Sequence, residues 1–164
     1  MNLLNSLINK FSGDIAIDLG TANIRVFVKG DNKIIKEPSV IAINKQTGRI
    51  LAVGNKARAM IGRTPANIVA VQPLKDGVIS DFNATEALIH FFIRKAKQKF
   101  RLSEQVFAPR VIIGVPSLIT EVEINAVTDS AKSAGARKVF IVEEPIAAAI
   151  GADLPIQEAQ GNMI

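Results

Sequence analysis

Two short segments of the chain carry residues that could bind a phosphate and a metal ion. The first runs from Asp18 to Asn23 and places a carboxylate at the end of an apolar run, directly before a glycine-containing turn. Because Gly20 can adopt a positive φ, the turn could expose backbone N–H groups, which together suit a phosphate. The carboxylate of Asp18 is the kind of ligand that holds a hydrated Mg²⁺. Taken alone, this string is typical of an ordinary hairpin turn.

The second segment runs from Val139 to Gly151 and places two adjacent carboxylates, Glu143 and Glu144, between an apolar run and an alanine-rich stretch. The apolar run predicts a strand, and Pro145 suits the first turn of a helix. A strand would then deliver both carboxylates to the start of a small-residue helix. A simpler interpretation is that the two acids only complement the positive end of the helix dipole.

Apolar periodicity predicts the elements that position these segments. The main body has predicted strands at residues 15–19, 24–29, 110–115 and 138–142, and predicted helices at residues 84–100, 120–134 and 145–151. A small β-rich lobe is expected between them, with strands at residues 33–36, 39–44, 49–53 and 68–71 and a short helix at 55–62. Gly135 lies where a C-cap glycine would. This order indicates an α/β fold with a mixed sheet.

Composition restricts the class of protein. With 164 residues, 48% apolar and 21% charged, the chain suits one folded domain, and it has no Cys for a disulfide or a thiolate metal site. No apolar run reaches the roughly 20 residues that span a bilayer, and the N-terminus is a poor signal peptide. The net charge of +5 suits a polyanion, but the chain has no Trp or Tyr, which disfavours nucleic acid.

Together these segments resemble the actin-like ATPase superfamily and, within it, the MreB family. The matching strings follow the family's order and spacing: Asp18 to Asn23, Glu37 to Ile43, Gly62 to Pro65, Asp76 to Ile79, Gly114 to Pro116, and Glu143 to Gly151. The resemblance implies a ribonuclease H-like domain I. Residues 13–32 and 77–152 would form subdomain IA, residues 33–76 subdomain IB, and residues 153–164 the start of a link to domain II.

The resemblance also implies an ATP site with Mg²⁺. Asp18 would organise the magnesium shell through water, the phosphates would lie against Gly20, Thr21, Ala22 and Asn23, and Glu144 would orient the attacking water. A carboxylate can polarise such a water while Mg²⁺ and backbone dipoles carry the phosphoryl charge. Full-length relatives are weak ATPases. Their second phosphate hairpin is expected directly after Ile164, so an incomplete site with weak ATP binding and no turnover is expected here.

The sequence departs from the family pattern at two further places. After Asn23 the family usually has Thr and an apolar residue, whereas this chain has Ile24 and Arg25. After Val122-Glu123 it usually has two arginines, whereas Ile124 and Asn125 stand here. The second departure falls in a region implicated in filament pairing, so lateral contacts are expected to differ.

Some features of the chain suit a membrane surface. Residues 1–12 are expected to form an amphipathic membrane-binding helix whose apolar face carries Leu3, Leu4, Leu7, Ile8 and Phe11. The alternative is a helix docked on its own domain. By resemblance, Val106 and Phe107 would also enter lipid. The nearby basic residues suit either anionic lipid or a solvated helix end: Arg94, Lys95, Lys97, Lys99 and Arg101. His90, among apolar neighbours, is expected to be structural.

The resemblance therefore implies a cytoplasmic, ATP-dependent filament protein at the inner face of the plasma membrane, which directs cell-wall synthesis and rod shape. Its expected partners are further copies of itself, anionic inner-membrane lipid and the cell-wall elongation machinery, but not nucleic acid. Alternatives are a chaperone or sugar kinase of the same superfamily, which share both motifs, and an inert fragment.

Overall fold

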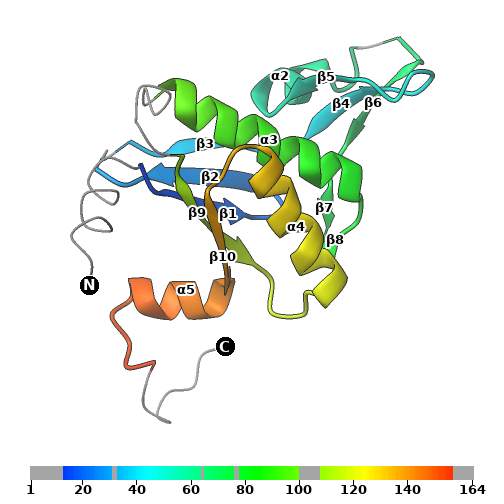
Figure 1. Cartoon of the computed structure of the whole chain (residues 1–164). Coiled ribbons are helices and arrows are strands. Elements are labelled where there is room, and N and C mark those ends of the chain that lie inside the picture. Colours follow the sequence, from blue (N-terminus) through cyan, green and yellow to red (C-terminus); the bar gives the residue numbers. More distant parts are fainter. Residues whose placement is uncertain (1–12, 31–32, 64, 76–77, 100–107, 157–164) are drawn as a thin grey trace.

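A five-stranded mixed sheet forms the centre of the molecule (Figure 1). The computed structural model describes residues 13–30, 33–63, 65–75, 78–99 and 108–156. The strands lie in the order β10-β9-β1-β2-β3 and comprise β1 (Ile15–Leu19), β2 (Asn23–Val28), β3 (Ile35–Pro38), β9 (Arg110–Val115) and β10 (Lys138–Glu143). β1, β9 and β10 run parallel, whereas β1–β2 and β2–β3 are antiparallel. The predicted mixed α/β fold is confirmed.

Alternation along the strands gives the sheet two different faces. In β1, Ile15, Ile17 and Leu19 are buried, whereas Ala16 and Asp18 point to the other side. The helices α3 (Phe82–Lys99) and α4 (Glu121–Ser133) cover the buried face (Figure 1). The shorter α5 (Glu144–Gly151) follows β10 directly. Two long helices thus form one core with the sheet and leave the Asp18 face open.

A smaller sheet stands beside α3 (Figure 1). It has the order β5-β4-β6 and consists of β4 (Ile41–Asn44), β5 (Ile50–Val53) and β6 (Ile68–Val71), with α2 (Asn55–Met60) packed on it. A two-stranded ribbon of β7 (Leu74–Lys75) and β8 (Val78–Ile79) leads into α3. The strand expected near residues 33–36 pairs with β2 instead, because Ile35 is buried in the main core. The small sheet therefore begins at Ile41.

One buried carboxylate joins the small lobe to the main body. Glu37 lies at the end of β3, and its Oε2 accepts a hydrogen bond of 3.1 Å from the backbone N–H of Asn55 at the start of α2. Its Oε1 pairs with the ammonium group of Lys95 on α3. Gly54 has φ +65, and a Cβ there would overlap the side chain of Glu37. Glycine is therefore required at position 54 both for its backbone angle and for space.

The helix ends agree with the sequence patterns in α4 and differ slightly in α3. Thr120 and Glu123 form a capping box at the start of α4, and Gly135 follows its C-cap with φ +91, as predicted. α3 begins at Phe82, two residues before the predicted start. The reason is Asp81, whose Oδ1 accepts the backbone N–H of Ala84 at 2.9 Å and so caps the first turn.

Two of the basic side chains near the end of α3 make contacts with other parts of the fold. The ammonium group of Lys97 donates to the backbone oxygens of Ala134 and Gly135, at 3.3 and 3.0 Å, and so caps the end of α4. Lys95 holds Glu37. His90 Nε2 lies 2.7 Å from Ser133 Oγ, which agrees with its expected structural role. The predicted membrane residues 1–12, Val106 and Phe107, and the basic Arg101, lie outside the described residues.

An ion pair between residues distant in sequence fixes the beginning of the parallel strands. Arg110 donates from Nε and Nη2 to the two carboxylate oxygens of Asp14, at 2.9 and 2.6 Å. This hydrogen bonding and the positive charge hold the pKa of Asp14 below its usual value, although burial opposes the shift. The two-point contact fixes the relative position of β1 and β9.

We predict that Arg110→Met lowers the free energy of unfolding at pH 7 by about 2 kcal/mol, the usual scale for a hydrogen-bonded charge. Because the pKa of Asp14 is lowered on folding, its contribution is full above the ordinary value of about 3.9 and is lost as the pH falls through the folded value. The difference from the wild type should therefore shrink below about pH 4. Urea unfolding between pH 3 and 7 measures it, with Lys132→Met as the exposed control. Equal effects of both variants would contradict the prediction.

Candidate functional site

An open cavity of about 550 Å³ lies on the sheet face that α3 and α4 leave free. Its walls come from β1, β2, β9 and the first turns of α5, and they include Asp18, Arg25, Gly114 and Glu144. The parallel register places Asp18 beside Gly114 and Gly114 beside Val142, two residues before Glu144. The two carboxylates singled out in the sequence, Asp18 and Glu144, are thus brought to one cavity.

Glu144 lies in an environment that disfavours its ionised form. Its Oε1 is buried and has no hydrogen-bond partner among the residues that the structure describes. Burial raises the pKa of Glu144, the negative charge of Asp18 raises it further, and Arg25 opposes both. Glu144 lies close to Gly114, where a Cβ would make an ordinary van der Waals contact with Glu144 Cγ at 3.7 Å. A carboxylate with a raised pKa in a cavity suits acid–base work on water.

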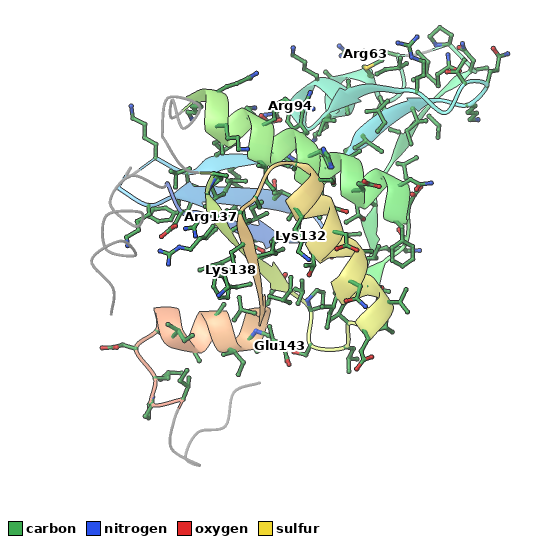
Figure 2. All side chains as sticks on the ribbon, viewed as in Figure 1. Arg63, Arg94, Lys132, Arg137, Lys138 and Glu143 are labelled. Carbon is green, nitrogen blue, oxygen red and sulfur yellow. The ribbon has the colours of Figure 1, made fainter. Side chains whose placement is uncertain are left out.

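The neighbouring Glu143 occupies a different environment. It is exposed, ends β10 and forms the N-cap of α5 without a side-chain hydrogen bond to the helix (Figure 2). It does not line the cavity. Within the pair, the geometry therefore favours Glu144 as the residue facing a ligand.

Asp18 has a partner that the sequence reasoning did not identify as a site residue. Arg25 lies directly across from it on β2, and its Nη1 donates to Asp18 Oδ2 at 2.6 Å. Both side chains are substantially exposed, so the pair itself contributes little stability. Residues facing each other across the predicted hairpin share one face, and this was the available signal for Arg25.

The turn from Gly20 to Asn23 has a different basis from the one expected. Gly20 is not among the glycines with positive φ. A Cβ at Gly20 would instead lie 2.7 Å from the backbone oxygen of Asn23, so glycine is needed for a close approach within the turn. The expectation of a positive φ at Gly20 is wrong, because glycine is needed there for space and not for a left-handed backbone angle.

The same turn is held by Ser39, a second residue that sequence reasoning missed. The fully buried Ser39 donates from Oγ to the backbone oxygen of Gly20 at 2.5 Å, and its N–H donates to the oxygen of Ala22 at 3.1 Å. Ser39 follows β3 on the way to the small lobe. These hydrogen bonds hold the carbonyl groups of Gly20 and Ala22 in the turn.

The donors present restrict the kind of metal that would fit. The described residues contain no group of three or more His, Cys, Asp or Glu side chains that could hold an ion. Asp18 alone would bind an ion that keeps most of its waters, as Mg²⁺ does.

Within the described ranges, no helix is long and apolar enough to cross a membrane.

The model of the MreB/Mbl protein family matches residues 12–164. The chain belongs to the MreB/Mbl family. It is 50% identical over 154 residues to the cell shape-determining protein Mbl of Bacillus cereus (strain ATCC 10987 / NRS 248), covering 94% of this chain and 45% of Mbl. It is 46% identical over 166 residues to the cell shape-determining protein MreB of Escherichia coli (strain K12), covering 99% of this chain and 47% of MreB. The chain thus spans about half the length of these MreB/Mbl relatives.

Among solved structures, the chain is similar to MreB5 of Spiroplasma citri bound to ADP, with 36% identity and a TM-score of 0.76. The match covers 92% of this chain and 44% of MreB5. A second MreB5 structure, bound to AMPPNP, matches with a TM-score of 0.74. The actin-like fold implied by the sequence is therefore confirmed, and the chain is a partial-length homologue of cell shape-determining MreB/Mbl proteins.

We predict that Glu144→Gln makes this MreB/Mbl chain more stable at pH 7, by about 1 kcal/mol, the scale of one unsatisfied buried group. The pKa of Glu144 is raised on folding, so its ionisation costs nothing below the ordinary value of about 4.3 and costs most above the folded value. The gain should therefore vanish below about pH 4. Thermal unfolding across this pH range measures it. The exposed Glu143→Gln is the matched control, and an equal gain in both variants would contradict the prediction.

Proposed function

We propose that this chain forms one wall of an ATP site in an actin-like filament protein that determines cell shape. The observation that carries the proposal is the half-buried Glu144, whose Oε1 is buried without a hydrogen-bond partner among the described residues, in a cavity that Asp18 and the phosphate hairpin also border. Membership of the MreB/Mbl family supports it. The nucleotide-bound structures of MreB5, which shares this fold, support ATP as the ligand.

In the proposed site each residue has a separate role. The backbone N–H groups of Thr21, Ala22 and Asn23, in the turn that Gly20 permits, contact the phosphates. Asp18 binds the water shell of Mg²⁺, an ion that neutralises phosphate charge when bound. Glu144 orients the attacking water and withdraws its proton, for which its raised pKa is suited. Turnover is proposed only for a protein of full family length, of which this chain spans about half.

Filament formation is proposed from the family relationship and from one surface of α4. Val122 in the first turn of α4 is 71% exposed, and Leu118 in the turn that precedes the helix is 92% exposed. Where such side chains form a contiguous apolar patch, the patch suits a contact between proteins. The sequence departures at Ile124 and Asn125 lie on the same helix, so the lateral contact proposed there differs from that of relatives.

Membrane association and the guidance of cell-wall synthesis at the inner face of the plasma membrane remain proposals. The residues expected to enter lipid lie outside the described ranges. The basic cluster gives less support than its sequence suggests, because Lys95 and Lys97 are engaged within the fold. The family relationship favours this filament function over the chaperone or sugar-kinase alternative.

The proposed role of Glu144 predicts a specific kinetic defect. In a polypeptide of full family length containing these residues, Glu144→Ala should lower kcat for ATP hydrolysis by roughly 10²-fold or more. The Kd for ATP should change little, because a residue that positions water acts mainly in the transition state. Phosphate release and ATP titration measure the two quantities. Glu143→Ala is the control, and the assignment is wrong if Glu143→Ala shows the defect and Glu144→Ala does not.

The Arg25–Asp18 pair predicts an altered magnesium requirement. The guanidinium group and a hydrated Mg²⁺ would compete for the same carboxylate, so Arg25→Leu should lower the Mg²⁺ concentration needed for half-maximal ATP binding. An exposed ion pair of this kind allows an effect of roughly two- to fivefold. Titration of Mg²⁺ at fixed ATP measures it. Arg25→Lys keeps the charge and should resemble the wild type. A higher Mg²⁺ requirement in Arg25→Leu would contradict the competition.

A further inference from the structure

A second cleft, of about 620 Å³, lies between the small lobe and α3. It is bordered by β5, the first turn of α2 and the second half of α3 (Figure 1). α3 packs on the sheet face opposite to the proposed nucleotide cavity, so the two hollows do not share a wall residue. The proposed ATP chemistry uses no side chain of this second cleft.

The cleft has a positive lining. Lys56 of α2 and Arg94 and Lys95 of α3 border it, and Figure 2 shows Arg94 on α3 beside the small lobe. Among the described residues of the lining, the only carboxylate is Glu37, which is already bound to Lys95 and to the N–H of Asn55. The charge of Lys56 and Arg94 is therefore not balanced by an acid of the cleft. A ligand with carboxylates would supply that balance.

Most of the remaining lining is apolar and includes the edge of a sheet. β5 ends the three-stranded order β5-β4-β6, so within the described part of the chain one of its edges has no neighbouring strand. Ile50 and Leu51 on this strand are 43% and 47% exposed, and Phe91 of α3 faces the same space. An unpaired edge offers N–H and C=O groups to an extended peptide.

The helical wall has a spacing that suits such a peptide. Arg94 and Lys95 lie three and four residues after Phe91, and Gln98 lies four and three residues after them, so the four residues form a single stripe along α3. This stripe runs past β5 and carries one apolar, two basic and one amide side chain. The cleft is within the size range of sites that enclose a ligand.

We propose that this cleft binds an extended segment of a partner protein in which apolar residues alternate with carboxylates. The segment adds to the small sheet as a strand beside β5. Its side chains alternate between two sides, as in any strand, so the apolar ones contact Ile50 while the carboxylates reach Lys56 and Arg94. A lipid surface would satisfy the charges, but it would not use the strand edge.

The test uses a fluorescent seven-residue peptide of alternating valine and glutamate, added to the purified chain without nucleotide. Anisotropy should show saturable binding, and the amide NMR signals of residues 50–53 should shift. Arg94→Glu and Lys56→Glu should each weaken binding about tenfold or more, since like charges then meet. Arg58→Glu is the matched control, because this exposed residue is on α2 but outside the cleft, and it should bind like the wild type.

Two modified probes separate strand pairing from simple charge attraction. A peptide N-methylated at alternate residues cannot donate along one edge and should lose most of its affinity, whereas a valine–lysine peptide should not bind. The proposal is overturned if no saturable binding occurs, if the N-methylated peptide binds equally, or if Arg58→Glu weakens binding as much as Arg94→Glu. It is also overturned if vesicles of phosphatidylglycerol, but not the peptide, shift the signals of residues 50–53.

The same measurements distinguish a partner segment from other possible occupants of the cleft. If a chain that starts at Gly13 binds the peptide many-fold more tightly than the whole chain, residues 1–12 occupy the cleft and the proposal fails. If Arg94→Glu abolishes concentration-dependent self-association, a second copy is the occupant, and the proposal fails likewise. Asp18→Ala, which removes the proposed magnesium ligand, should leave peptide binding unchanged. A failure of the ATP proposal would therefore not alter this result.

Discussion

The parallel pairing of β1, β9 and β10 is the constraint on which the candidate site depends. This register brings Asp18 beside Gly114 and places Glu144 just past the end of the neighbouring strand. A shift of one residue would turn Asp18 into the core and Leu19 toward the cavity, since successive side chains point to opposite faces. The two-point contact between Asp14 and Arg110 opposes such a shift at the start of the strands. Stability and site geometry thus rest on the same strand register.

The segment from Glu37 to Ser39 connects the small lobe with the phosphate hairpin. Glu37 holds the first turn of α2 and Lys95, while Ser39 holds the backbone of Gly20 and Ala22. Glu37 and Ser39 are both buried, and they are only two positions apart. A change in the position of the small lobe would therefore be expected to strain the turn that borders the cavity. In this arrangement the lobe supports the site without contributing a side chain to it.

Local periodicity and ordered motifs were enough to predict the α/β class, most helix bounds, the glycine that follows α4 and the two carboxylates of the cavity. It did not allow contacts between distant residues to be predicted. The pairing of β3 with β2 depends on the burial of Ile35, and the roles of Ser39 and Lys97 depend on backbone atoms far along the chain. The restriction at Gly20 is a distance of 2.7 Å to Asn23, which no residue pattern encodes. Strand alternation pointed to Arg25, but only after the hairpin register was known.

The electrostatics of the cavity distinguish a site from a structural cluster. A carboxylate that serves stability gains partners on folding, as Asp14 does with Arg110 and Glu37 does with Lys95. The Oε1 atom of Glu144 is buried without a partner among the described residues, so burial, together with the negative charge of Asp18, raises the pKa of Glu144 and makes its ionisation unfavourable. A residue that only complemented the dipole of α5 would lie in solvent, as Glu143 does. At Glu144, burial and a nearby negative charge both oppose the ionised form of an acidic residue. Such a conflict is expected where a side chain is kept for chemistry rather than for folding.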